Sequence, residues 1–215
     1  MDKKITTAQI KEVAQQAYDL YKTNTDGKNA DYIPYLANIN KNLFGISICL
    51  LNGQTIEVGD SEYRFGIESV SKVHTAILVL RQYGAKELLE KIGADATGLP
   101  FNSIIAAATV ANLGLNPVTK KQVFDAELSP KITSMISTVG FYEHTGDWLY
   151  TSGIPAKTGV GGGVMGVLPG QFGISAFAPP IDQAGNSVKA QLAIKYVMNK
   201  LGLNVFNGHR VTIVD

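Results

Sequence analysis

Ser69 and Lys72 are the residues of this chain whose types and spacing point most directly to covalent chemistry. They stand three positions apart at the start of an apolar helical pattern, and residues with this spacing lie on one face of a helix. A serine hydroxyl is a weak nucleophile at neutral pH unless a base lies beside it. A lysine can be that base once burial or nearby positive charge lowers its pKa. The pair predicts nucleophilic catalysis, although Ser-x-x-Lys alone also occurs by chance in many chains.

Lys157-Thr158-Gly159 is a second element, and it makes the first more specific. Ser-x-x-Lys followed by Lys-Thr-Gly is the arrangement of β-lactamases and penicillin-binding proteins, in which the serine is the nucleophile. The glycine-rich run 161–166 also fits Gly-x-Gly-x-x-Gly. Strand-like sequence follows this run, whereas a helix follows a dinucleotide-binding loop, so we predict no cofactor there.

The composition indicates one folded domain, residues 1–215. Hydrophobic residues make up 45% of the chain and charged residues 17%, and the net charge of +1 gives no drive toward nucleic acid or an anionic membrane. The lone Cys49 cannot form an internal disulfide. The N-terminus has no apolar signal region, and no apolar run reaches the ~20 residues of a membrane helix. The histidines lack metal-ligand spacing. We expect a cytoplasmic protein with no metal and no cofactor.

The predicted elements alternate in kind along the chain. Periodicity, caps and turn signals predict helices at 7–23, 69–83, 86–92, 104–113, 129–140 and 188–201, and strands at 43–51, 54–59, 147–152, 162–168 and 171–177. The simplest way to cover their apolar faces is an α/β (α+β) fold. We predict a mainly antiparallel sheet from both chain ends, flanked by terminal helices, with a reduced helical lobe at 69–140. Ser69 and Lys157 would meet between sheet and lobe.

Six segments, in order along nearly the whole chain, carry a further signal. They are Asp-Tyr-Ile-Pro at 31–34, Phe-Gly-Ile-Glu-Ser-Val-Ser-Lys-Val at 65–73, Gly-Leu-Pro-Phe-Asn-Ser at 98–103, Gly-Phe-Tyr at 140–142, the run 152–163, and Pro-Pro with Gly-Asn-Ser-Val at 179–188. Together they resemble the serine-dependent glutaminases, which have a β-lactamase-like fold. The resemblance implies hydrolysis of L-glutamine to L-glutamate and ammonia through an acyl-enzyme.

The resemblance also implies roles for individual residues. Ser69 matches the nucleophile, Lys72 its activating partner, and Tyr142 a tyrosine that relays protons near it. The residues implied to bind substrate are Tyr32, Ser69, Tyr142, Lys157 and Val160. The backbone N–H of Val160, together with that of Ser69, matches the oxyanion hole.

The chain departs from the family in its middle. Family members are longer. After Phe-Asn-Ser they carry a helical region whose glutamate and asparagine hold the substrate, and then a Tyr-x-x-Cys-Ser segment whose tyrosine lies near the nucleophile. Here Ser103 passes within a few residues into Thr109, so the chain resembles a glutaminase with its centre removed, by a natural or an engineered deletion. We therefore expect strongly reduced or absent glutaminase activity. The alternatives are an inactive scaffold, or a Ser-Lys hydrolase of simple esters or β-lactams. A homo-oligomer is left open.

Overall fold

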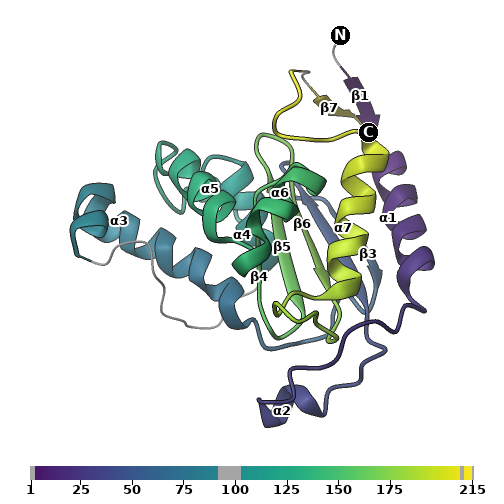
Figure 1. Ribbon diagram of the computed structural model, residues 1–215. Helices are drawn as coiled ribbons and strands as arrows, with labels where there is room; N and C mark the ends of the chain where they lie inside the picture. The colour runs from purple at the N-terminus through teal and green to yellow at the C-terminus, as the bar shows by residue number, and fades with distance from the viewer. Residues whose placement is uncertain (1–2, 92–102, 209–210, 215) are drawn as a thin grey trace.

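A five-stranded antiparallel sheet lies at the centre of the computed structural model, which describes residues 3–91, 103–208 and 211–214 (Figure 1). The strand order is β3-β2-β6-β5-β4. The strands are β2 (Gly45–Leu50), β3 (Thr55–Gly59), β4 (Ala156–Thr158), β5 (Gly163–Leu168) and β6 (Phe172–Phe177). The central pairing joins β2 to β6, with Ile46 opposite Ala176. The predicted α+β fold, with a sheet from both ends of the chain, is confirmed.

Helices α1 (Thr7–Tyr21) and α7 (Val188–Leu201) lie side by side on one face of the sheet (Figure 1). α1 begins in a capping box: the Thr6 hydroxyl accepts from the Gln9 N–H, and the Gln9 side chain accepts from the Thr6 N–H. Ser187 caps α7 with its hydroxyl, which accepts from the Ala190 N–H. The buried stripes of both helices form a first apolar core with residues of the strands, as their periodicity predicts.

α4 (Ser103–Ala111) packs on the opposite face, chiefly against β6. A Cβ atom added at Gly173 of β6 would lie 2.7 Å from the Cβ of Ala107. The helix therefore reaches the strand where a glycine faces an alanine, and the alanine-rich sequence of α4 permits this approach. With α3 (Ser71–Lys91) and α5 (Leu128–Val139), α4 encloses a second apolar core.

α3 projects further from the sheet than its neighbours (Figure 1). Gly84 within it has φ 75° and ψ 167°, which is not helical, so two helical parts meet there. The predicted stop at Gly84 and restart at Lys86 are confirmed. The predicted end at 92 and the segment 98–102 lie outside the described residues. The division into a sheet and a lobe at 69–140 stays a prediction.

The segment 147–152, predicted as a strand, belongs to a helix, α6 (Thr145–Ser152). The ring of Trp148 stacks on Phe141 at a centroid distance of 4.0 Å, and its indole N–H donates to the Ile154 carbonyl oxygen at 2.9 Å. The prediction was wrong because so short a run fits both periods. Only the burial of Trp148 against these partners selects the helix.

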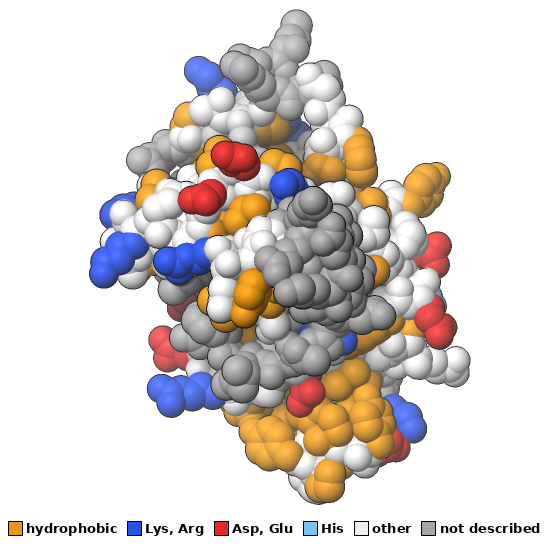
Figure 2. All heavy atoms as spheres, turned by 90° about the vertical axis from the view of Figure 1, so that its left-hand side faces the viewer, with side chains coloured by type: hydrophobic (Ala, Val, Ile, Leu, Met, Phe, Trp, Pro, Cys, Tyr) orange, Lys and Arg blue, Asp and Glu red, His pale blue; other side chains and the backbone are white. Residues whose placement is uncertain are grey.

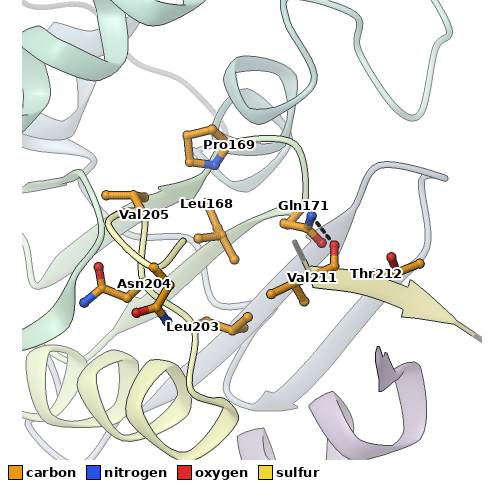
Figure 3. A pocket seen from close by; sticks show the side chains of 9 residues that line it. Leu168, Pro169, Gln171, Leu203, Asn204, Val205, Val211 and Thr212 are labelled. Atoms are coloured by element: carbon orange, nitrogen blue, oxygen red, sulfur yellow. Dashed lines mark hydrogen bonds between the residues drawn. The ribbon is translucent and has the colours of Figure 1, made fainter. Parts of the chain in front are cut away.

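A second, two-stranded parallel sheet joins the ends of the described chain, β1 (Lys3–Thr6) to β7 (Val211–Val214), and was not predicted. The side-chain amide of Gln171 donates to the Val211 carbonyl oxygen at 2.7 Å and ties this sheet to β6 (Figure 3). Beside it lies a cavity of about 420 Å³, whose lining includes none of the predicted site residues. No helix in the described ranges is long and apolar enough to cross a membrane.

Candidate active site

Ser69 lies in a 3₁₀ turn, η1 (Glu68–Val70), that leads directly into α3. Glu68 has a φ of +48°, a left-handed conformation that non-glycine residues adopt at a cost and that clusters at functional sites. The Ser71 hydroxyl holds the turn by donating to the Glu68 carbonyl oxygen at 2.7 Å. Ser69 is half-buried, and Lys72 follows in the first turn of α3. The structure thus places the predicted pair at the entry of this helix.

The end of β4 packs directly against the Ser69 turn. A Cβ atom added at Gly159 would lie 3.2 Å from the Ser69 nitrogen and 2.8 Å from the Ile67 carbonyl oxygen. A glycine is needed where two backbones come this close. The strand that carries Lys157 therefore meets the turn that carries Ser69, and the two sequence elements are neighbours in space.

Tyr142 stands beside both elements, in a 3₁₀ turn after α5, with a φ of +51°. Desolvation of its buried hydroxyl is the main cause that raises the pKa of Tyr142; the Ser69 hydroxyl and the Val160 N–H act to lower it, and Tyr32 and Glu68 to raise it. No hydrogen bond of standard distance and angle reaches the Tyr142 hydroxyl within the described part of the chain. The Ser69 hydroxyl and the Val160 N–H therefore lie close to the Tyr142 hydroxyl without being well aligned for hydrogen bonds to it.

Lys157 is buried, with 4% of its surface exposed. Its amine donates to the carbonyl oxygens of Gly140 and Thr158, at 3.2 and 2.7 Å, and lies 4.5 Å from the centroid of the Tyr142 ring. Burial in the first place, and the positive charge of Lys72 in the second, lower the pKa of Lys157 to about 7. Near neutral pH both protonation states of Lys157 are populated. The sequence predicts Lys72 as the base, and the structure adds Lys157 as a second candidate.

The backbone N–H groups of Ser69 and Val160 lie where the turn after β4 meets the Ser69 turn. In the turn after β4, the Gly159 N–H donates to the Gly163 carbonyl oxygen at 2.9 Å, and the Gly162 N–H donates to that of Gly159 at 3.0 Å. The Val160 N–H lies close to the Tyr142 hydroxyl and acts to lower its pKa, and the Ser69 nitrogen lies at the packed junction with Gly159. Backbone N–H groups beside a nucleophile are the donors from which an oxyanion hole is built.

Tyr32 stands at the rim of the site, immediately before helix α2 (Pro34–Ala37). It is 66% exposed, yet its hydroxyl is near enough to influence the pKa of Tyr142. All six residues that the sequence singled out therefore belong to one region of the fold. No group of three or more metal-ligating side chains occurs in the described ranges.

Gly185 is a neighbour of the site that the sequence analysis missed. It has a φ of +92°, and a Cβ atom there would lie 3.2 Å from Val160 Cγ1 and 3.5 Å from Tyr142 Cε2. The carboxylate of Asp182 fixes the loop by accepting from two of its backbone N–H groups, at 3.0 and 2.9 Å. This loop therefore packs against both Tyr142 and Val160. Its sequence indicates a turn, but not what the turn packs against.

Comparison with known proteins agrees with this arrangement. The family model for glutaminases matches residues 27–109 and 105–206. The chain is 67% identical over 321 residues to the glutaminase of Parabacteroides distasonis and 57% identical to that of a Bacteroides fragilis strain, and both alignments cover 100% of each chain. Among solved structures, the probable glutaminase ybaS has a TM-score of 0.89 at 29% identity, covering 95% of this chain and 100% of its own. This chain belongs to the glutaminase family, a family of amidohydrolases.

The comparisons also locate what this chain lacks. Its 215 residues are aligned over 321 residues of the Parabacteroides distasonis glutaminase, so a long internal stretch of that relative, here called the missing segment, has no counterpart. Since 215 is 67% of 321, an identity of 67% over that span means that nearly every residue present here is the same in the relative. The two family matches meet at 105–109, within α4. The predicted deletion is thus confirmed, and the missing segment would join the chain in that helix.

Proposed function

We propose that this chain hydrolyses L-glutamine to L-glutamate and ammonia through an acyl-enzyme on Ser69, with turnover lowered by the missing segment. The observation that carries the proposal is the position of Tyr142, whose hydroxyl neighbours both the Ser69 hydroxyl and the Val160 N–H. A nucleophile, a proton relay and an oxyanion donor therefore lie within reach of one reacting carbonyl.

The steps follow from this arrangement. The Ser69 Oγ attacks the side-chain amide carbon, and its proton passes to Lys72 directly or through the Tyr142 hydroxyl. The N–H groups of Ser69 and Val160 stabilise the tetrahedral oxyanion, an effect worth about 3 kcal/mol per donor. The proton then moves to the amide nitrogen, the C–N bond breaks and ammonia leaves. A water molecule then attacks the γ-glutamyl ester and gives one proton to the base, which passes it to the Ser69 oxygen as the ester bond breaks and L-glutamate leaves.

Lys157 sets the charge of the proton relay. Its amine lies over the Tyr142 ring and shares the site with Lys72. Because its pKa is about 7, the two lysines together carry fewer than two positive charges above neutral pH. We therefore expect the rate of glutamine hydrolysis to rise as the pH increases through about 7.

A covalent route occurs in one solved protein of the same fold. The Bacillus subtilis glutaminase YbgJ forms a covalent complex with 5-oxo-L-norleucine by reaction with 6-diazo-5-oxo-L-norleucine, and its structure has a TM-score of 0.79 to this chain at 20% identity, covering 93% of this chain and 99% of its own. A low turnover is proposed because a glutamine substrate needs several fixed partners for its α-amino and α-carboxylate groups. The missing segment removes a large part of the protein from which such partners could come.

Ammonia release from L-glutamine tests the proposal. We expect a rate well below that of the Parabacteroides distasonis glutaminase, and none in Ser69→Ala. Ser137→Ala is the matched control, because the Ser137 hydroxyl bonds within its own helix, to the Thr133 carbonyl oxygen at 2.8 Å. Turnover that persists in Ser69→Ala would disprove the nucleophile, and turnover equal to that of the relative would disprove the role of the missing segment.

A second candidate function is hydrolysis of simple esters or β-lactams. It is favoured by the exposed rim, where Tyr32 is 66% accessible and leaves the site open to bulkier substrates. An activated ester and a β-lactam, assayed beside glutamine, separate the candidates. Ser69-dependent turnover of these without ammonia release from glutamine would replace the first proposal, and no turnover of any substrate would leave an inactive scaffold.

A cytoplasmic location and a homo-oligomeric state are further proposals. The family relationship agrees with the first. Cell fractionation tests the location, and a membrane-bound fraction would contradict it. Sedimentation of the purified chain tests the oligomeric state, and a pure monomer would contradict a homo-oligomer.

A further inference from the structure

Glu68 is a charged residue beside the nucleophile that takes no part in the proposed steps. It comes directly before Ser69 and is half-buried. Its φ of +48° costs free energy in a residue other than glycine, and such conformations persist only where the surrounding structure fixes them. Because they cluster at functional sites, the contacts of this side chain are informative.

Two glycines leave room for the Glu68 side chain. A Cβ atom added at Gly161 would lie 3.2 Å from Glu68 Cγ, and one added at Gly66 would lie 3.4 Å from Glu68 Oε1. Gly161 directly follows Val160, the second expected oxyanion donor. The carboxylate is also near enough to the Tyr142 hydroxyl for its charge to raise the pKa of that group. The Glu68 carboxylate therefore lies at the candidate site, against the turn after β4.

This carboxylate has no cationic partner within the described part of the chain. The side-chain ion pairs found there involve Asp19 and Asp31, which lie far from Glu68 in the sequence. Lys72 is the charge that acts on the buried amine of Lys157, and Glu68 is not among the groups that do so. A half-buried carboxylate without a counter-charge favours the binding of a cation, because its own charge is only partly solvated.

Aromatic side chains lie near this carboxylate and at the rim of the site. Tyr32 acts on the Tyr142 hydroxyl together with Glu68. Tyr32 and Tyr35 are 66% and 60% exposed, and Figure 2 shows hydrophobic side chains gathered at the lower end of the molecule, at the height that α2 has in Figure 1. The faces of aromatic rings attract organic cations, so these surroundings suit an ammonium group better than an inorganic ion.

We propose that the Glu68 carboxylate binds the α-ammonium group of the substrate, so that the chain selects side-chain amides that carry a primary ammonium there. The inference names the substrate group recognised at the proposed active site, and it therefore rests on the proposed function. Glu68 and Ser69 are consecutive, with Cα atoms about 3.8 Å apart, and the two ends of glutamine that they would hold are only a few bonds apart. With the missing segment absent, this retained carboxylate is a partner that the substrate still finds.

Binding at Glu68 also acts on the proton relay. The negative charge of Glu68 is one of the causes that raise the pKa of Tyr142. An ammonium group bound to the carboxylate offsets this charge, so the pKa of Tyr142 falls when the substrate binds and its hydroxyl gives up a proton more readily. An amide without the ammonium group lacks both the contact and this effect.

The test compares two ligands, L-glutamine and glutaramate, which is glutamine without its α-amino group. Their dissociation constants are measured by calorimetry in the full chain carrying Ser69→Ala, so that no turnover is needed. We expect glutamine to bind roughly tenfold more tightly than glutaramate, as for one hydrogen bond to a charged group, and this ratio to fall to about one or below on adding Glu68→Gln. Glu68→Asp, which keeps the charge, should retain part of the ratio.

Glu143→Gln is the matched control, because Glu143 is an exposed neighbour of Tyr142 in sequence and is not among the charges that act on its hydroxyl. It should leave the ratio unchanged. Retained binding of glutaramate shows that Glu68→Gln is folded, and Glu68→Asp answers the question if it is not. No binding of glutamine, no preference for it, or the same preference in Glu68→Gln would overturn the proposal. The last result also covers a role of Glu68 through Tyr142 alone, which would affect both ligands equally.

Turnover is scored separately, in the chain that retains Ser69. Glu68→Gln should raise the KM for glutamine roughly tenfold and change kcat less than about twofold, because it removes the ammonium contact and the opposing charge together. A glutamine preference that depends on Glu68, without ammonia release, supports the ammonium site and contradicts the proposed function. Ammonia release without that preference supports the proposed function and contradicts the ammonium site.

Discussion

Replacing Lys157 with methionine tests whether this lysine titrates as its surroundings require. In the folded chain its pKa is about 7, against 10.5 for an ordinary lysine, and it is 4% exposed. Below pH 7 both the folded and the unfolded state bind the proton, so the folded state bears the whole cost of burying the charge. Between pH 7 and pH 10.5 the unfolded state keeps a proton that the folded state has released. Stability must therefore rise with pH in this window.

The size of the effect follows from the same values. Each pH unit in which the unfolded state holds one more proton adds about 1.4 kcal/mol to the free energy of unfolding. Between pH 7 and pH 10 the unsubstituted chain should gain roughly 4 kcal/mol relative to Lys157→Met, which has no proton to release.

Urea unfolding at pH 7, 8.5 and 10 measures this gain for the unsubstituted chain and for Lys157→Met. Groups distant from Lys157 titrate alike in both proteins and cancel in the difference. Lys200→Met, at an exposed lysine in the last turn of α7, is the control and should follow the unsubstituted chain. Parallel stability curves for Lys157→Met and the unsubstituted chain would refute the reasoning.

Three further substitutions test the supports of the site and the core. Gly185→Ala should lower turnover, because the added Cβ would lie 3.2 Å from Val160 Cγ1. Gly170→Ala is the control, because Gly170 also has a positive φ but has nothing within 4 Å of an added Cβ. Both variants should lose about 1 kcal/mol of stability, and Gly170→Ala should leave turnover unchanged. Equal turnover of the two variants would contradict this. Trp148→Ala should cost about 3–5 kcal/mol in urea unfolding, because a buried stacked ring and its hydrogen bond are lost; a loss under 1 kcal/mol would show that the ring is not packed as described. Ser187→Ala should cost roughly 2 kcal/mol, because it removes both the cap of α7 and the hydrogen bond that the hydroxyl donates to the buried Ala178 carbonyl oxygen at 2.7 Å, and an unchanged midpoint would argue against both contacts.

Local signals in the sequence predicted most of the fold. Thr6 with Gln9 marks the start of α1, and Asn52-Gly53 marks the hairpin between β2 and β3, because caps and tight turns depend on residues a few positions apart. The small parallel sheet escaped prediction since its two short strands come from opposite ends of the chain. α6 was mistaken for a strand because the partners that bury Trp148 lie outside its own segment.

The residues of the candidate site also separate into those that local sequence indicates and those whose role depends on contacts with distant parts of the chain. Spacing alone indicated Ser69 with Lys72, and the family resemblance added Tyr142, Val160 and Tyr32. The lowered pKa of Lys157 depends on its burial and on Lys72, which come from distant parts of the chain, so no local pattern contains it. The support that Gly185 gives to Tyr142 and Val160 is likewise a contact between distant segments.

Reaction with 6-diazo-5-oxo-L-norleucine, followed by mass spectrometry of the intact chain and of its peptides, tests most directly whether Ser69 is an activated nucleophile in this shortened glutaminase. The arrangement of Ser69, Tyr142 and Val160 predicts one 5-oxo-L-norleucine adduct per chain, on Ser69, and none in Ser69→Ala. An unmodified chain, or an adduct on any other residue, would contradict it.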